Sequence, residues 1–366
     1  MKVDDSGMQR PDMRRNRLTA LLDMQYPLIQ GPYGGGLSTV ELLVSVSEAG
    51  GLGSFGANNL DGPSIAQLVD TIRARTRKAF AINLWVPGPQ SDTSPAELAR
   101  AIERMGRWYD LLGIEPPGVP SSCAGPAFEQ QIEALLEVRP PVFSFVFGVP
   151  ATHVLDKCRA HGIATIGTAT TVAEAIILDR AGVDAIVASG FEAGGHRGSF
   201  LRPAEESLIG TLALVPQVVD SVTAPVIAAG GIADARGVAA ALMLGAQGAQ
   251  IGTAFLACAE ANLPQPHRQA ILSVPVKETV LTKAFSGRLA RSVRNGLSDA
   301  CAAGDLPLLP YPAQAWLINT MRSAAVSQDR DDLLSLSCGQ AAGLVQGTSA
   351  RELVGSIVSG LQELLT

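Results

Sequence analysis

Short apolar runs recur along the chain and alternate with segments of helical periodicity. Eight of these runs end in small, polar or turn-forming residues. They are YPLIQGP (26–32), GLGSFGA (51–57), FAINLWVP (80–87), VFSFVFGVP (142–150), IATIGTA (163–169), AIVASG (185–190), PVIAAGG (225–231) and AQIGTAF (249–255). Helical patterns such as STVELLVSVSEAG and DARGVAAALMLGA lie between most of them, and several contain a glycine where a helix should end.

This alternation indicates an α/β fold. Strands that are apolar throughout, each followed by a helix, are typical of a parallel sheet that is covered on both faces. Eight βα units in about 250 residues predict a closed (β/α)8 TIM barrel. An open doubly wound sheet has the same periodicity and remains the alternative, because the pattern does not reveal closure.

Two segments depart from the alternation. Residues 88–141 separate the third and fourth runs and include a helix start at Ser94, with Pro95 next and Glu97 completing a capping box. After the eighth run the βα pattern stops. We therefore predict a barrel over residues 1–258, a small helical domain over 259–339, and a C-terminal helix over 340–366 that returns to the barrel.

Composition narrows the class of protein. Hydrophobic residues make up 47% and charged residues 17%, and the net charge of −6 is spread without a basic tract, which disfavours nucleic acid and anionic membranes as partners. No apolar stretch is long enough to span a membrane. The polar N-terminus MKVDDSGMQRPDMRRNR lacks the core of a signal peptide, so we expect it to be frayed or to lie on the surface.

The cysteines indicate the cellular compartment. Cys123, Cys158, Cys258, Cys301 and Cys338 are odd in number and have no CxxC spacing, so we expect free thiols and a cytoplasmic location. The sequence leaves the oligomeric state open, a homo-oligomer included.

One glycine motif is misleading. GLGSFG at 51–56 matches the GxGxxG fingerprint of dinucleotide-binding proteins. That fingerprint requires a strand before the glycines and a helix after them. Here a helical pattern precedes them and a loop follows, so we interpret the segment as a turn and the second barrel strand.

A stronger signal lies at the ends of the last two runs. Gly230 and Gly231 end the seventh, with a helix expected from about Asp234, and Gly252 and Thr253 lie in the eighth. Loops after these two barrel strands often bind phosphate, because glycine exposes backbone N–H groups. The remaining strand ends carry amides, hydroxyls and glycines but no acid pair or metal cluster. Such a mouth suits a cofactor with its own reactivity, and flavin mononucleotide (FMN) fits.

His196 is the candidate catalytic residue. It follows the sixth run in GFEAGGHRG, where Gly194 and Gly195 permit close approach to a ligand. It would be the only strong general base near the mouth; the alternative is a loop histidine bound to solvent or a carbonyl. We expect Glu192 to brace the loop, while Arg197 is either a surface residue or a phosphate partner.

With these motifs, the chain resembles the nitronate monooxygenase family, also called 2-nitropropane dioxygenases. PLIQGPYGGGLS, FAINLWVP, GFEAGGHRG and the stretch PVIAAGG to GTAF carry the resemblance, and TKAFSGRLARSVRN adds to it. It implies an FMN-bound barrel with His196 over the flavin, as base or orienting group. The substrates would be a nitro compound and O2, and the products a carbonyl compound and nitrite. The implied flavin contacts are Pro32, Tyr33, Asn83, Thr168, Ser189, Gly194, Gly231, Gln250, Ile251, Gly252 and Thr253, to which the motifs add Gly195 and Gly230.

The chain also departs from the family. Many relatives have APM or GGM where this chain has Gly31, Pro32 and Tyr33, and many have Gln or Asp in place of Ser189. These differences leave the substrate open. Two alternative functions remain: an NAD(P)H-dependent flavin reductase of quinones or enoyl thioesters, and a barrel that binds a phosphorylated ligand without redox chemistry.

Overall fold

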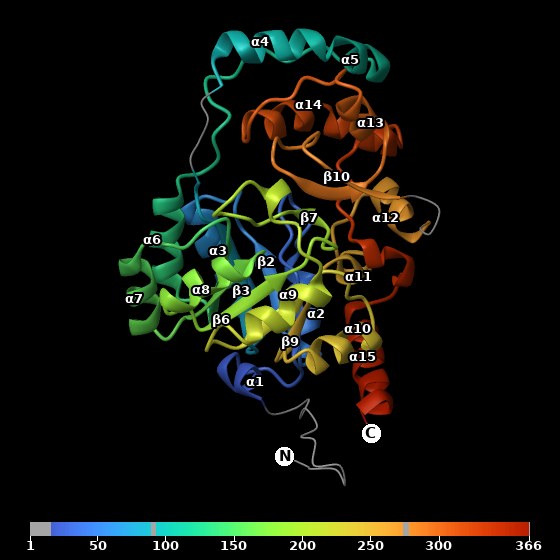
Figure 1. Ribbon diagram of the computed structural model, residues 1–366. Coiled ribbons are helices and arrows are strands. Elements are labelled where there is room, and N and C mark those ends of the chain that lie inside the picture. The colour runs from blue at the N-terminus through green and yellow to red at the C-terminus, as the bar shows by residue number, and fades with distance from the viewer. Residues whose placement is uncertain (1–15, 89–92, 274–277, 366) are drawn as a thin grey trace.

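The computed structural model describes residues 16–88, 93–273 and 278–365 (Figure 1). The expectations for residues 1–15 at the polar N-terminus lie outside the described residues. All eight apolar runs form parallel strands of one sheet. These strands are β1 (Leu28–Gln30), β2 (Gly53–Gly56), β3 (Phe80–Trp85), β4 (Val142–Val146), β5 (Ala164–Ala169), β6 (Ala185–Ser189), β8 (Val226–Ala229) and β9 (Gly248–Ile251).

The sheet closes on itself. Its strand order is β1-β9-β8-β6-β5-β4-β3-β2, and a parallel bridge between Ile29 and Leu52 joins the first and last strands. Backbone hydrogen bonds from Gln30 N to Leu52 O (3.0 Å) and from Leu52 N to Leu28 O (2.9 Å) seal this junction. The predicted (β/α)8 barrel is therefore confirmed, and the open sheet is excluded. The GLGSFG motif lies largely in β2, as we expected from its neighbours.

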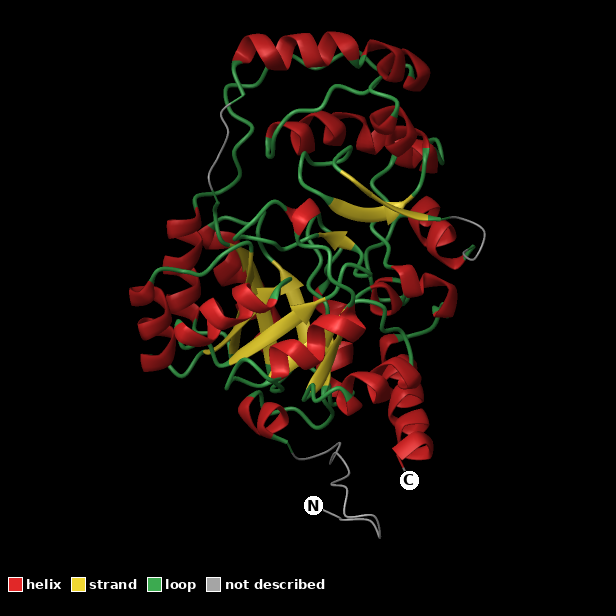
Figure 2. Cartoon of the chain, viewed as in Figure 1, coloured by secondary structure: helices red, strands yellow, loops and turns green. Residues whose placement is uncertain are grey.

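Helices surround the barrel, as Figure 2 shows. Each strand except the last is followed by a helix that returns the chain to the opposite end of the barrel. Several helices end at a glycine with positive φ, among them Gly50, Gly162, Gly182 and Gly245. The outer helices are α2 (Val40–Glu48), α3 (Gly62–Arg73), α6 (Phe128–Val138), α7 (Thr152–Ala160), α8 (Val172–Arg180), α9 (Thr211–Val219) and α10 (Ala235–Met243).

The barrel interior has an apolar layer and a polar layer. Alternate residues of a strand point to opposite faces, so every second residue points inward. Near the start of the strands the inward residues are apolar, as Ala81, Val187 and Ile227 are, and α1 (Arg17–Leu21) adds the buried Leu18 to this cluster. Two residues further along, the inward positions carry polar groups, such as Asn83 and Ser189. This change places amides and hydroxyls at the carboxyl ends of the strands.

Two helices of the insertion between β3 and β4 lie away from the barrel strands. Helix α4 (Pro95–Arg104) begins with the predicted Ser94–Glu97 capping box, and α5 (Gly106–Leu112) follows it. In Figure 1 both helices lie across α14 (Ala313–Ser327). Tyr109 Oη lies 3.1 Å from Thr320 Oγ1, and Gln328 Nε2 donates to the Leu112 carbonyl at 2.9 Å. The insertion therefore ties an early part of the chain to a late one.

Segment 259–339 contains two strands besides the helices that we expected there. Two strands, β10 (Thr279–Thr282) and β11 (Ala290–Val293), pair antiparallel, and β11 also pairs with β7 (Gly195–His196). Because β7 and β11 lie far apart in the sequence, their pairing leaves no local periodic signal in it. The helices of this segment, besides α14, are α12 (Gln265–Leu272) and α13 (Gly296–Ala302), with a 3-10 turn at Asp331–Leu333.

The C-terminal helix α15 (Ala350–Leu365) packs against α10 and α2 on the outside of the barrel. Its buried residues, among them Val354, Ile357 and Leu361, recur at helical spacing along one face. None of the helices in the described part of the chain is both long and apolar enough to cross a membrane. The short helices α11 (Thr253–Leu256), Ala204–Glu206 and Gln340–Leu344 complete the described elements.

Candidate active site

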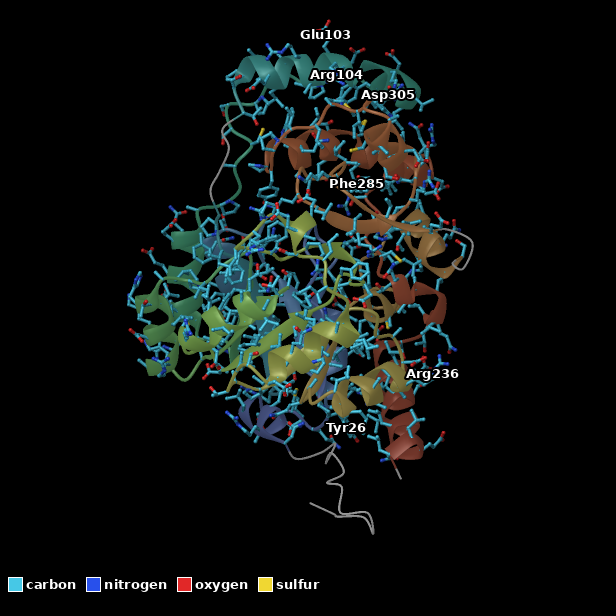
Figure 3. All side chains as sticks on the ribbon, viewed as in Figure 1. Tyr26, Glu103, Arg104, Arg236, Phe285 and Asp305 are labelled. Carbon is cyan, nitrogen blue, oxygen red and sulfur yellow. The ribbon has the colours of Figure 1, made fainter. Side chains whose placement is uncertain are left out.

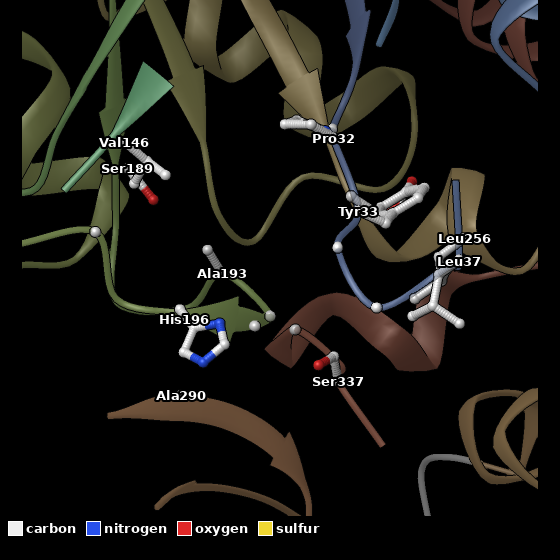
Figure 4. Close-up of a pocket in the computed structure, with 18 of the residues that line it drawn as sticks. Pro32, Tyr33, Leu37, Val146, Ser189, Ala193, His196, Leu256, Ala290 and Ser337 are labelled. Atoms are coloured by element: carbon white, nitrogen blue, oxygen red, sulfur yellow. Dashed lines mark hydrogen bonds between the residues drawn. The ribbon is translucent and has the colours of Figure 1, made fainter. Parts of the chain in front are cut away.

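A cavity of about 390 Å³ opens at the carboxyl ends of the barrel strands. Active sites of TIM barrels lie at this end, where the βα loops meet. The segment 259–339 covers it from above, and Phe285, labelled in Figure 3, lies at this junction and lines the cavity. Figure 4 shows Pro32 and Tyr33 on one side of the cavity and Ser189 and His196 on the other.

Nearly all of the predicted site residues line this one cavity. Ile251 is the exception: its side chain is fully buried in the hydrophobic core, because it points outward from β9 while Gln250 points inward. Its backbone carbonyl accepts a hydrogen bond from Gly31 N at 2.9 Å. The predicted residues that line the cavity are Pro32, Tyr33, Asn83, Thr168, Ser189, Gly194, Gly195, His196, Gly230, Gly231, Gln250, Gly252 and Thr253.

The turns after β8 and β9 present backbone N–H groups to the cavity. Gly230 and Gly231 have φ of 102° and 71°, a region that favours glycine. The N–H groups of Gly231, Ile232 and Gly252 donate no hydrogen bond to any described residue. A Cβ added to Gly252 would meet no atom within 4 Å. Free N–H groups beside open space are the elements of an anion-binding turn.

His196 lies on β7, and its ring is held from several sides. Its Nε2 lies 2.7 Å from Ser286 Oγ, and its ring packs edge-on against Trp85 at 5.1 Å between centroids. Burial, followed by the positive charge of Arg288, lowers the pKa of His196 from 6.5 to about 4. The imidazole is therefore neutral at pH 7, with its other nitrogen free to meet a ligand.

An aromatic cluster surrounds this imidazole. Phe147 packs against Trp85 with 5.0 Å between ring centroids, and Trp85 lies 5.8 Å from Tyr311. The Arg288 guanidinium stacks over Phe147 at 4.2 Å and over Tyr311 at 4.3 Å. Phe147 has a φ of 73°, which is costly for a bulky residue and is found mostly at functional sites. The end of the cavity beside His196 is thus apolar and close to the positive charge of Arg288.

Tyr33 bridges the first and last strands at the rim. Its Oη donates a hydrogen bond to the Gly252 carbonyl at 2.8 Å, next to the predicted phosphate turn. Burial raises the pKa of Tyr33 well above its ordinary value, and the nearby Cys258 adds to this rise. The phenol therefore stays protonated and acts as a donor that fixes Gly252.

Glu192 and Arg197 brace the loop that carries His196. The Glu192 carboxylate accepts from Thr211 N at 2.9 and 3.0 Å, as we expected of a bracing residue. Arg197 is buried and donates to the carbonyls of Gly190 (2.7 Å) and Ser189 (3.0 Å). Its guanidinium is thus buried, so the option of a surface residue is wrong, and the option of a phosphate partner stays a prediction.

Sequence reasoning missed the contribution of segment 259–339. Ser286, Tyr311 and Ser337 line the cavity, and Gly339 N donates to Thr253 Oγ1 at 2.9 Å. The one sequence signal for part of this group was the family-like stretch TKAFSGRLARSVRN, which contains Ser286. Asn319, Arg322 and Ser335 carried no motif, because a helix or loop far along the chain does not reveal which cavity it covers.

Comparisons with known proteins agree with this geometry. Residues 15–360 match the family described as nitronate monooxygenase. The chain is 39% identical over 358 residues to the probable nitronate monooxygenase of Staphylococcus aureus strain Newman, covering 96% of this chain and 98% of the relative.

Solved structures show the same relationship. A nitroalkane oxidase from Streptomyces ansochromogenes superposes with a TM-score of 0.85 at 33% identity, over 95% of this chain and 98% of the other. FabK from Thermotoga maritima superposes with a TM-score of 0.74 at 29% identity, over 96% and 97% of the two chains. The barrel, its glycine turns and the histidine beside the cavity thus occur in a chain that matches one enzyme family over nearly its whole length. This chain belongs to the nitronate monooxygenase family and is a flavin-dependent oxidoreductase.

Proposed function

We propose that the chain binds FMN and oxidises alkyl nitronates and nitroalkanes with O2 to carbonyl compounds and nitrite. The observation that carries this proposal is the neutral imidazole of His196, which lines the same cavity as the glycine turns after β8 and β9. A neutral nitrogen base beside a flavin is the arrangement that abstraction of a weakly acidic C–H proton requires.

The residues fit FMN. The free N–H groups of Gly231, Ile232 and Gly252 suit its phosphate, and the open space at Gly252 leaves room for one. The cavity volume lies in the range of ordinary small-molecule sites. Pro32, Tyr33, Asn83, Thr168, Ser189 and Gln250 would surround the ring system, while Gly194, Gly195, Gly230 and Thr253 would lie beside it; Ile251 supports from the core. Bound FMN would supply the electron transfer from substrate to O2.

The protein side chains prepare the substrate. His196 would take the α-proton of a nitroalkane or orient the nitro group, and the aromatic cluster would exclude water around it. A pKa near 4 keeps the imidazole unprotonated but also weakens it as a base. A nitronate has already lost this proton, and its negative charge is attracted by Arg288. The site should therefore act on nitronates more readily than on neutral nitroalkanes.

The first test is the visible spectrum of the purified protein, followed by anaerobic mixing. We expect a yellow protein whose flavin is bleached by ethylnitronate and not by NADH. Rapid bleaching by NADH or NADPH alone would instead favour a reductase of quinones or enoyl thioesters. A colourless protein that takes up no FMN would favour a barrel that binds a phosphorylated ligand without redox chemistry.

The role of His196 is tested by His196→Asn. We expect kcat/KM for neutral nitroethane to fall by about 10² or more, since the substitution removes the base. The value for ethylnitronate should fall much less, because that substrate needs no proton abstraction. Oxygen consumption measures both, and the flavin content of the variant serves as control. Equal loss on both substrates would show that His196 is not the base.

A further inference from the structure

We propose that Ser286 is a positioning residue that keeps the single proton of neutral His196 on Nε2, so that an unprotonated Nδ1 faces the cavity. The catalytic consequence rests on the function proposed above, whereas the position of the proton does not. Ser286 lies in the turn between β10 and β11, so a residue outside the barrel would set the chemistry of a barrel loop.

The backbone fixes this contact. Residues of β7 and β11 pair as His196 with Ala290, and Arg197 N donates to Leu289 O at 2.9 Å. These bonds hold the ring against the turn, where Nε2 lies 2.7 Å from Ser286 Oγ. No described residue forms a hydrogen bond with Nδ1. In Figure 4 one ring nitrogen of His196 points toward the strand that carries Ala290 and the other toward the cavity.

Counting protons favours one of the two neutral forms. The Ser286 hydroxyl has one proton and two lone pairs. Its Oγ lies 3.3 Å from the Arg288 carbonyl, to which it donates, and 3.3 Å from Arg288 N, from which it accepts. The remaining lone pair then accepts from His196 Nε2–H. If the hydroxyl donated to Nε2 instead, the Arg288 carbonyl would lose its only hydrogen bond from a described residue.

The third form, an imidazolium with protons on both nitrogens, is disfavoured by charge. The Arg288 guanidinium lies close to the ring, and its Nη1 is buried with no hydrogen-bond partner among the described residues. A second positive charge in this apolar cluster would be uncompensated. His196 therefore stays neutral, and Ser286 selects which nitrogen carries the proton.

The selected form decides what His196 can do. An unprotonated Nδ1 accepts a proton or a hydrogen bond from the substrate. In the opposite form Nδ1 carries a hydrogen and can only donate. Loss of the Ser286 hydroxyl would leave both forms populated, so part of the enzyme would hold a histidine that is unable to act as a base.

The test is the ¹⁵N NMR spectrum of the flavin-loaded protein with ¹⁵N-labelled histidine, since protonated and unprotonated ring nitrogens give well-separated signals. His196→Asn assigns the residue by loss of its signals. We expect His196 at pH 7 to be protonated on Nε2 and unprotonated on Nδ1. Protonation on Nδ1, or on both nitrogens, would overturn the proposal, and this measurement on the parent protein does not depend on whether any variant folds.

Variants then test whether Ser286 is the cause. Ser286→Ala should produce a mixture of the two forms, and Ser286→Thr, which keeps the hydroxyl, should restore the parent spectrum. Ser292→Ala is the matched control. Ser292 lies in the neighbouring strand β11 and its Oγ accepts from Leu336 N, so its loss perturbs the same hairpin without touching His196. An unchanged spectrum in Ser286→Ala, or the same change in Ser292→Ala, would overturn the assignment to Ser286.

Activity gives a separate readout. We expect Ser286→Ala to lower kcat/KM for neutral nitroethane by about twofold, in proportion to the fraction of enzyme in the incompetent form, while sparing ethylnitronate, and Ser286→Thr to recover most of it. If the parent protein oxidises neither compound, the proposed function fails, and the NMR result still decides where the proton lies. If the parent oxidises both but the spectra contradict Nε2 protonation, only this inference fails.

Discussion

At the scale of residues, hydroxyl groups hold the polar parts of the site in place. Tyr33 and Ser286 lie on different sides of the cavity, and each bonds to a group that the proposed reaction needs. Tyr33 donates to Gly252 O, which fixes the predicted phosphate turn, while Ser286 bonds to His196 Nε2. Both contacts are short and partly buried, where a lost hydrogen bond costs more than on the surface.

Replacing Tyr33 by Phe tests the first of these contacts. We expect a loss of about 1 kcal/mol in the free energy of unfolding, because the Gly252 carbonyl loses one of its two donors and keeps only Leu256 N. The Kd for FMN should also rise, since the phosphate turn is less fixed. Fluorescence titration of the apoprotein measures the affinity.

The matched control is Tyr109→Phe. Tyr109 is fully buried and bonds to Thr320 Oγ1 between the insertion and α14, outside the cavity lining. This variant should lose similar stability and keep the parent affinity for FMN. If both variants bind FMN as the parent does, Tyr33 has no part in the cofactor site.

At the scale of elements, the site depends on close contact between two loops. The loop that carries His196 meets the start of the short helix Gln340–Leu344, where Gln340 N donates to Glu192 O at 2.9 Å. One residue earlier, Gly339 N donates to Thr253 Oγ1 at the start of α11, also at 2.9 Å. Gly194 makes this approach feasible. A Cβ at this position would lie 2.6 Å from the backbone of Cys338 and Gly339.

Two glycine substitutions separate the roles of contact and space. Gly194→Ala should force the two loops apart, which lowers the melting temperature and weakens FMN binding together. Gly252→Ala places a methyl group where nothing lies within 4 Å, at a negative φ of −94°. It should leave the melting temperature nearly unchanged and weaken FMN binding, because the methyl occupies the space expected to hold the phosphate. Unchanged affinity in Gly252→Ala would contradict the proposed phosphate position.

At the scale of the whole molecule, three distant stretches of chain form one structure around the cavity. The barrel supplies the strand ends, segment 259–339 covers them, and α4 and α5 lie on the other side of that segment (Figure 1). Arg104 and Asp305, labelled in Figure 3, lie at this last contact, where Arg104 donates to the Gly304 carbonyl at 3.4 Å. The division at residues 258 and 339 remains a prediction, since the segments share their contacts.

The stability of the whole molecule should depend on pH through His267. This residue on α12 is 3% exposed, and its Nε2 lies 3.0 Å from Ser337 O in the cavity wall. Burial is the main reason that its pKa falls from 6.5 to about 4. Between these values the unfolded chain binds a proton that the folded chain does not. Folding stability contributed by the neutral ring is therefore present above pH 6.5 and is lost as pH falls toward 4.

The contribution of His267 is about 2 kcal/mol between pH 7.5 and pH 5, and His196, whose pKa is lowered in the same way, adds its own contribution. Urea unfolding at both pH values measures it, and His267→Asn should lose less stability on acidification than the parent does. His153→Asn, at an exposed position on α7, should follow the parent. An equal pH dependence in the parent and His267→Asn would contradict the assignment.

Much of the candidate site was predictable, because it lies at strand ends. Gly230, Gly231 and Gly252 follow apolar runs whose positions in a barrel are fixed by their order, and His196 follows another. The residue whose role the sequence misjudged shows the limit: Arg197 lies beside His196 in the sequence but is buried, and it bonds to carbonyls. Its direction depends on which backbone groups surround it, and no local pattern records that.

The sequence by itself determined the barrel, the mouth at its strand ends, and the glycine turns and histidine placed there. The physical basis of these features is local, because apolar runs, helix caps and glycine conformations act within a few residues. The tertiary structure decided that β11 pairs with the strand of His196, that Ser286 reaches Nε2, and that Gly339 bonds to Thr253. These contacts join residues far apart in the chain, and they exist only because packing of the whole molecule brings their backbones within hydrogen-bond distance.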